Sequence, residues 1–214
     1  MHITSLGHSC LLVETGGRRI LIDPGAFSSA WHDQRDLDAV LVTHQHPDHI
    51  DPAAVPGLLA ANPAARVLVE PAVLDIIGDP RAEAMVPGEA VDLDGVRLSP
   101  VGGRHAVIHA DIPRVGNVGV VLSADGEPTL LHPGDAYEYT PDGIDVLACP
   151  VNAPWCAFKE TVEFARGVGA GVLVPIHDAL LSGVGRELYL RQLGNLGQTP
   201  IQDLRDAGRA PVAP

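Results

Sequence analysis

The stretch His44-Gln45-His46-Pro47-Asp48-His49 places three imidazoles and one carboxylate within six residues. It follows an apolar run at 39–42, which is typical of a buried β-strand. Neutral imidazole and carboxylate form a ligand set that suits zinc and, to a lesser degree, iron or manganese. Side chains 44 and 46 can bind one ion, while 48 and 49 turn toward a second. The stretch therefore indicates a site for two metals, and a histidine-rich surface loop is the alternative interpretation.

Outward from this stretch, one pattern occurs twice along the chain. In the first copy, a hairpin with a Gly16-Gly17 turn leads to a Pro-Gly turn and then to an apolar run that opens with an aspartate, over residues 10–44. Residues 118–151 repeat this order around an Asp125-Gly126 turn. The repeat predicts two related halves and two sheets that face each other.

The other apolar runs and turn residues of the chain predict a mixed α/β domain. Runs rich in β-branched and apolar residues predict strands at 9–14, 19–22, 39–43, 66–70, 96–101, 118–123, 129–132, 145–150 and 171–176. Periodic segments with Pro, Gly or polar start signals predict helices at 52–61, 71–78, 159–168 and 185–196. A length of 214 residues suits one domain, which we assign to residues 1–205. The segment 206–214, rich in Ala, Pro and Gly, is predicted to be a flexible C-terminal tail.

Charge and hydropathy limit the partners. With 14 basic and 27 acidic residues the formal net charge is −13, so nucleic acid and anionic membrane surfaces are not expected partners. A small molecule is expected instead, and Arg104 and Arg114 could bind an anionic group through bidentate hydrogen bonds. The sequence has no apolar run of membrane-spanning length and no signal-like start, which predicts a cytoplasmic protein. The oligomeric state is left open.

The H-x-H-x-D-H pattern after a hydrophobic strand resembles the metallo-β-lactamase superfamily, and the resemblance covers essentially the whole chain. It implies an α/β fold: an αββα four-layer sandwich of two similar halves with facing mixed β-sheets. His49 is followed by Ile50-Asp51-Pro52, and an early Gly7-His8-Ser9 precedes the first hairpin. Both features are similar to the branch that contains ascorbate-phosphate lactonase.

The resemblance also implies the roles of individual residues. Asp135 in the His-Pro-Gly-Asp segment would bridge two ions, and Asp48 and Asp135 are the catalytic carboxylates. Asp23 would orient a ligating imidazole rather than bind metal. His105 is the favoured third histidine of the first ion, and His109 is the alternative ligand. The full ligand set implied is His44, His46 and His105 for one ion, Asp48, His49 and His177 for the other, and Asp135 for both.

The implied activity is that of a dinuclear hydrolase, in which a hydroxide held between two divalent ions attacks a small-molecule lactone, ester or phosphoester. Zinc is the expected metal, with manganese and iron as alternatives. His8, Arg104, Arg114 and Trp155 are candidate residues of the substrate pocket. Two other functions stay open, a non-catalytic metal-binding accessory protein and iron-dependent oxygen or sulfur chemistry on the same fold.

Overall fold

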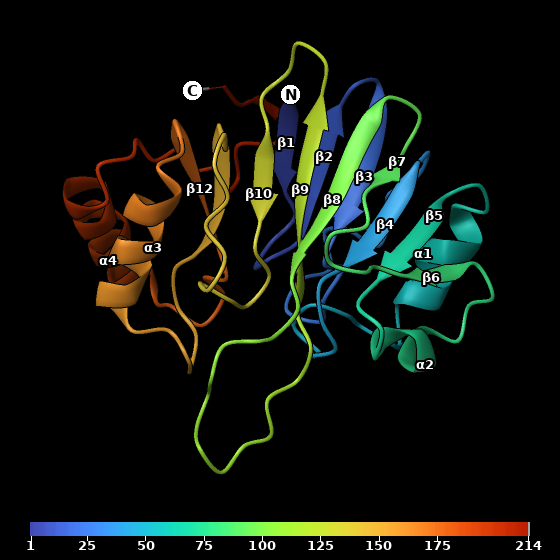
Figure 1. Cartoon of the computed structure of the whole chain (residues 1–214), viewed down its shortest axis with the longest axis horizontal. Helices are drawn as coiled ribbons and strands as arrows, with labels where there is room; N and C mark the ends of the chain where they lie inside the picture. The colour runs from blue at the N-terminus through green and yellow to red at the C-terminus, as the bar shows by residue number, and fades with distance from the viewer. Residues whose placement is uncertain (214) are drawn as a thin grey trace.

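The structure, a computed structural model, describes residues 1–213 and contains two mixed β-sheets (Figure 1). Over the described residues the first sheet has seven strands in the order β13-β1-β2-β3-β4-β5-β6. The bounds are β1 His2–Ser5, β2 Leu11–Thr15, β3 Arg18–Ile22, β4 Ala39–Val42, β5 Arg66–Val69, β6 Ala82–Ala84 and β13 Ala210–Pro211. The neighbouring strands from β13 through β1 and β2 to β3 pair antiparallel. Those from β3 through β4 and β5 to β6 pair parallel.

The second sheet comes from the other half of the chain. Within residues 1–213 it has six strands in the order β12-β11-β10-β9-β8-β7. The bounds are β7 Val91–Asp92, β8 Val96–Gly102, β9 Val118–Ala124, β10 Leu130–His132, β11 Val146–Pro150 and β12 Val172–Ile176. The helices are α1 Val55–Ala61, α2 Val73–Ile77, α3 Phe158–Val168 and α4 Gly183–Leu196.

Alternating side chains build the four layers. In β4, Ala39 and Leu41 enter the core between the two sheets, whereas Val40 and Val42 face the opposite way, in the cluster that contains Leu58 of α1. The second sheet is covered in the same manner on its outer face, by α3 and α4 (Figure 1). Burial of apolar surface on both faces of each sheet supplies most of the stabilising free energy. The predicted αββα sandwich is confirmed.

The two halves share their topology, as the repeated sequence pattern predicts. The strands β2 and β3 form an antiparallel hairpin, β4 joins β3 in parallel, and α1 leads to the parallel strand β5. The second half repeats this with β9, β10, β11, α3 and β12. Each of the predicted strands and helices is present, and their ends differ from the prediction by at most three residues.

The end of the chain requires a correction. The segment 206–214 is predicted to be a flexible tail, but its described part pairs with the first sheet: Ala210 and Pro211 form β13 against β1. Val212 is only 1% exposed because it packs into the core between the sheets. Residue 214 lies outside the described residues. Among residues 1–213, no helix has both the length and the apolar character that crossing a membrane requires.

Candidate metal centre

The candidate site residues gather at one edge of the two sheets. The strands β3 and β4 run parallel, as do β10, β11 and β12, so the carboxyl ends within each set share an edge. Both β8 and β10 pair antiparallel with β9, so β8 ends at the same edge as β10. The turn between β1 and β2 lies at the end of β3 for the same reason. From this edge the loop of residues 103–117 extends away from the sheets (Figure 1).

The first cluster consists of four side chains whose potential ligand atoms all lie within 4.8 Å of one another: His44, His46, His105 and Asp135. His44 Nε2 lies 3.1 Å from His46 Nδ1, and His105 Nε2 lies 3.4 Å from Asp135 Oδ2. His46 is half-buried, whereas the other three are buried. The cluster is therefore open to solvent on the His46 side.

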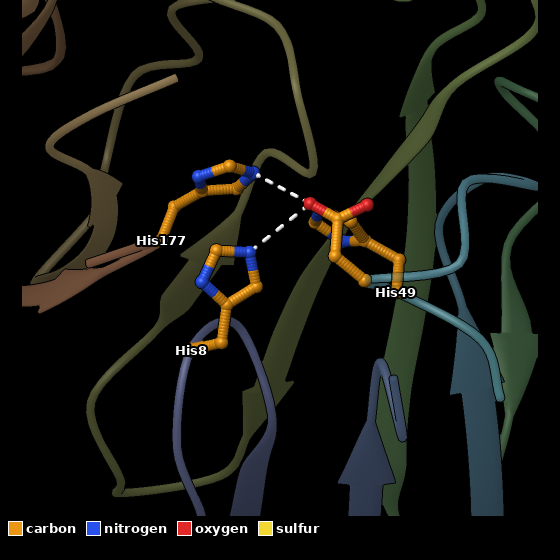
Figure 2. Close-up of side chains that lie close together, drawn as sticks. His8, His49 and His177 are labelled. Atoms are coloured by element: carbon orange, nitrogen blue, oxygen red, sulfur yellow. Dashed lines mark hydrogen bonds and ion pairs between the residues drawn. The ribbon is translucent and has the colours of Figure 1, made fainter. Parts of the chain in front are cut away.

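The second cluster has the same compactness and consists of His8, Asp48, His49 and His177. In Figure 2, dashed lines run from the rings of His8 and His177 to one oxygen of an unlabelled carboxylate, which is that of Asp48. The distances to Asp48 Oδ2 are 3.1 Å from His8 Nε2 and 3.2 Å from His177 Nε2. His8, which the sequence places only in a candidate substrate pocket, is thus part of this cluster.

Asp135, a member of the first cluster, also contacts the second cluster. Its Oδ1 atom is 3.1 Å from His49 Nε2, and its Oδ2 atom is 3.1 Å from His177 Nε2. The same Oδ2 atom faces His105 of the first cluster. One carboxylate therefore contacts histidines of both clusters, which is the position that a bridging ligand requires.

Asp23 fixes the orientation of two rings. It is fully buried, and its backbone has a left-handed φ of 52°, which few residues other than glycine adopt. His49 Nδ1 lies 2.7 Å from Asp23 Oδ2. Thr43 Oγ1 donates to the same carboxylate and faces His44 Nδ1 at 3.1 Å, so it can accept the proton of that ring. In the neutral form that binds a metal, both rings then carry the proton on Nδ1 and direct the Nε2 lone pair into the cluster.

Backbone carbonyls do the same for two further rings. His105 Nδ1 lies 2.7 Å from the carbonyl oxygen of Ala106, and His177 Nδ1 lies 2.6 Å from that of Asn152. A carbonyl oxygen can only accept, so each ring donates from Nδ1. Among the described residues, the buried atoms of the two clusters without a hydrogen-bond partner are His49 Nε2, His105 Nε2, His177 Nε2 and Asp135 Oδ1.

The unpartnered buried atoms show whether the two clusters could bind a metal ion. A buried polar atom without a partner costs free energy, so a set of them converging on one space indicates a ligand. Imidazole nitrogens and carboxylate oxygens at this spacing are the donors that zinc and related divalent ions take. The residues present fit metal ions in both clusters.

Opposite charges stabilise each other within the clusters. Burial lowers the pKa of His49, but the carboxylates of Asp135 and Asp23 outweigh it and raise that pKa well above its ordinary value. Burial likewise opposes ionisation of Asp135 and Asp48, and the neighbouring imidazoles nevertheless hold both carboxyl pKa values far below their usual range. The carboxylates are therefore ionised at neutral pH, which is the form that binds a cation.

The other predicted residues lie at different places. His109 is outside both clusters, with a side chain that is 66% exposed. Arg114 donates to the carbonyl of His105 and to the Glu138 carboxylate, so it holds the His105 backbone instead of offering a free cation. Arg104 is exposed and lines a cavity of about 430 Å³ that none of the clustered side chains borders.

Trp155 contacts the site through its ring nitrogen. The indole N–H donates to Asp135 Oδ2 at 2.8 Å, and the side chain is buried. Asp135 is also held through its backbone, because its N–H donates to Asn117 Oδ1 at 2.9 Å. Trp155 is thus a hydrogen-bond partner of the shared carboxylate, a role that the sequence did not reveal. Asn117 was not predicted at all.

Gly25 is a second residue that sequence reasoning left without a role. Its backbone lies so close to the histidine-rich loop that a Cβ atom there would be 1.8 Å from the carbonyl oxygen of Asp48. Two hydrogen bonds join the same segments, from Ala26 N–H to the Pro47 carbonyl and from Asp51 N–H to the Pro24 carbonyl. The Pro-Gly turn after β3 therefore supports the loop that carries Asp48. The Pro24-Gly25 dipeptide signals a turn but not this contact.

The position of His105 leads to a testable difference from His109. We expect His105→Ala to lose metal from the first cluster, because it removes one of four converging donors. We expect His109→Ala to keep its metal, because that ring is exposed and faces only its own loop. Metal content of the two purified variants, measured by mass spectrometry, checks this. Metal loss in His109→Ala with full loading of His105→Ala would contradict the assignment.

Comparison with known proteins identifies the family of the chain. A family model described as "Beta-lactamase superfamily domain" matches residues 2–177. The chain belongs to this family. Among similar proteins, Protein Rv0786c of Mycobacterium tuberculosis is 40% identical over 205 residues, covering 95% of this chain and 96% of that protein. A UPF0173 metal-dependent hydrolase of Methanoregula boonei is 29% identical over 193 residues, covering 83% of this chain and 82% of that protein.

The solved structures support the fold of this β-lactamase superfamily domain. The metallo-beta-lactamase fold protein YhfI from Bacillus subtilis superposes with a TM-score of 0.72 at 17% identity, over 94% of this chain and 95% of that chain. At this identity the likeness concerns the fold alone. The narrower resemblance to the ascorbate-phosphate lactonase branch stays a prediction.

Proposed function

We propose that this protein is a metal-dependent hydrolase that uses two divalent metal ions on a small-molecule lactone, ester or phosphoester. The observation that carries the proposal is the convergence of unpartnered ring nitrogens on the two oxygens of one carboxylate, Asp135. A similar protein of Methanoregula boonei is named a metal-dependent hydrolase, which supports the same class.

The clusters divide the ligands between two sites. His44, His46 and His105 would hold the first ion, and Asp48, His49 and His177 would hold the second. Asp135 would contact both, since each of its oxygens faces at least one of these rings. Zinc is the metal we expect first, because three histidines, or histidines with a carboxylate, form its usual catalytic ligand sets.

When bound, a pair of divalent ions supplies a water-derived nucleophile at neutral pH and polarises the oxygen of the scissile group. The protein positions this chemistry through fixed side chains. Asp23 and Thr43 hold two of the rings, and Trp155 holds one oxygen of Asp135. Because the rings and the carboxylate are oriented before substrate arrives, little reorganisation is required during the reaction. No side-chain general base is part of the proposal.

Substrate would reach the site on the side where Asp48 is partly exposed. A cavity of about 330 Å³ adjoins the second cluster and is lined by His8, Phe27 and Arg205, among others. Its volume is in the range of small-molecule pockets. The lining includes acidic residues as well as Arg205, so an anionic substrate stays a prediction. The small-molecule partner, the exclusion of nucleic acid and membrane as partners, and a cytoplasmic location stay predictions as well.

Metal content is the first test of the proposal. Protein purified without added metal, and the same protein after reconstitution with Zn²⁺, should contain two ions per chain, one for each cluster. Inductively coupled plasma mass spectrometry gives the number and the identity of the metals. One ion per chain after reconstitution, with the Asp48, His49 and His177 cluster empty, would contradict the two-metal proposal.

A panel of lactones, carboxylic esters and phosphoesters is the second test. The metal-loaded protein should hydrolyse at least one class, and Asp135→Asn prepared in parallel controls for contaminating hydrolases. Two bound metals without any turnover would favour a non-catalytic metal-binding protein. A coloured, redox-active iron preparation would favour iron-dependent oxygen or sulfur chemistry.

A further inference from the structure

His8 differs from the other histidines of the two clusters in where its proton lies. Its Nδ1 atom accepts a hydrogen bond from the backbone N–H of Ala179 at 3.3 Å. A neutral imidazole whose Nδ1 accepts must carry its proton on Nε2. The Nδ1 atoms of His49, His105 and His177 instead face oxygen acceptors. His8 therefore presents an N–H to the second cluster, whereas these three rings, in the neutral form that binds a metal, present a lone pair.

The N–H of His8 has an acceptor in place. Asp48 Oδ2 lies 3.1 Å from His8 Nε2, and the same oxygen lies 3.2 Å from His177 Nε2 (Figure 2). The side chain of His8 is 1% exposed, whereas that of Asp48 is 17% exposed. A buried donor thus holds the one carboxylate of the second cluster that is partly open to solvent.

The backbone holds this ring firmly. His8 and His177 have left-handed φ angles of 53° and 60°, and the His177 N–H donates to the His8 carbonyl at 3.0 Å. Such conformations persist only where the surrounding structure fixes them, and they are frequent at functional sites. The rings of His177 and Phe27 pack against His8 with centroid distances of 4.0 and 5.0 Å.

We propose that His8 is a positioning residue that donates its Nε2–H to Asp48 and is not itself a metal ligand. This inference rests on the proposed two-metal function, because it concerns the orientation of a ligand of the second ion. His8 would do for the carboxylate of Asp48 what Asp23 does for the ring of His49. Hydrogen-bond partners of this kind set the orientation of metal ligands and strengthen metal binding.

A ligand role for His8 is the alternative that the distances allow, since its ring also lies within the second cluster. That role would require the proton to move from Nε2 to Nδ1. The ring would then direct an N–H at the N–H of Ala179, and two donors repel each other. The two roles therefore predict different tautomers in the metal-loaded protein.

Nuclear magnetic resonance reads the tautomer directly. The full-length protein is labelled with ¹⁵N-histidine and titrated with Zn²⁺, and long-range ¹H–¹⁵N spectra distinguish Nδ1–H from Nε2–H rings. The His8 signals are assigned by their loss in His8→Gln. With two zinc ions bound, His8 should keep the Nε2–H pattern while His49 and His177 show Nδ1–H. An Nδ1–H pattern with a zinc-shifted Nε2 for His8 would overturn this inference and leave the two-metal function standing.

Zinc affinity of variants gives a second readout that does not depend on turnover. Chelator competition separates the first and second dissociation constants. His8→Leu removes the donor and should weaken the second zinc by about 10- to 100-fold with the first unchanged. His8→Gln has an amide N–H that can reach the Nε2 position, and it should bind the second zinc within about threefold of the wild type, a smaller loss than the one expected for His8→Leu. His109→Leu, a matched loss of an exposed imidazole, should change neither constant.

The possible outcomes separate the inference from the proposed function. Unchanged second-zinc affinity in His8→Leu would overturn the positioning role, and so would equal losses in the Leu and Gln variants. A wild type that binds a single zinc would overturn the two-metal function itself, and the role of His8 would fall with it.

Discussion

Asp135→Asn should abolish hydrolysis and weaken metal binding at both clusters. The two oxygens of this carboxylate face His49, His177 and His105, so in the proposed two-metal site its charge would balance two cations at once. The amide keeps the shape but removes that charge, and it places an NH₂ group toward either a ring nitrogen or the indole N–H of Trp155. We expect a loss of at least about 1,000-fold in turnover, the upper end of what removing one preorganised electrostatic contact costs.

Asp23→Asn is the matched control, because it makes the same change in a buried carboxylate that contacts a ligand and no metal. It contacts one ligand ring directly, His49, through the 2.7 Å contact at Nδ1, and it reaches His44 only through the hydroxyl of Thr43. Loss of such a partner typically costs about 10- to 100-fold in metal affinity or activity, and here the effect should be larger for the second ion than for the first. Metal content and turnover of both variants decide the matter. A near-normal rate and two metals in Asp135→Asn would refute the shared carboxylate.

The fold could be predicted largely from local patterns, because short apolar runs bounded by turn residues are typical of buried strands. The run 39–42 enters one core with Ala39 and Leu41 and the other with Val40 and Val42, so its continuous apolarity fits a strand covered on both faces. The strands that were missed, β1, β6, β7 and β13, are two to four residues long and carry too few apolar positions to form a pattern. Their place depends on the sheet edges that they extend.

The residues of the candidate site could also be predicted only in part. The histidine-rich loop follows one strand without a gap, so its four donors could be placed from their spacing alone. His105 could be separated from His109 only as a preference, since both follow β8. The structure distinguishes them because His105 lies directly where that strand ends, at the shared edge.

Contacts between distant segments could not be predicted. Trp155 donates to Asp135 across 20 positions of the chain, and His8 reaches Asp48 across 40. Both contacts depend on turn conformations, such as the left-handed backbone of His8, that the identity of the residue does not require. Glycine is the usual occupant of such a position, and although histidine is enriched there, most histidines have a negative φ, so a histidine by itself gives no turn signal.

Gly25→Ala should have the second large effect, on stability and on metal binding together. The added Cβ atom would lie 1.8 Å from the Asp48 carbonyl oxygen and 2.7 Å from the His49 backbone nitrogen, both of them main-chain atoms in a hydrogen-bonded loop. The loop must move to relieve this contact, and Asp48 and His49 move with it. Overpacking costs about 1 to 3 kcal/mol and occasionally more, and a contact this short with rigid backbone falls at or above the upper end.

For a chain of this length, a loss of about 3 kcal/mol lowers the melting temperature by roughly 6 to 12 °C. Thermal unfolding of the metal-free protein measures this loss of stability. Zinc titration of folded Gly25→Ala should show that the second metal site is weakened and the first is retained. Gly57→Ala is the matched control, because a Cβ at that exposed helical position meets no atom within 4 Å. It should be neutral or stabilising by up to about 1 kcal/mol. A Gly25→Ala protein with the melting temperature and both metals of the wild type would show that the Pro-Gly turn does not support the metal-binding loop.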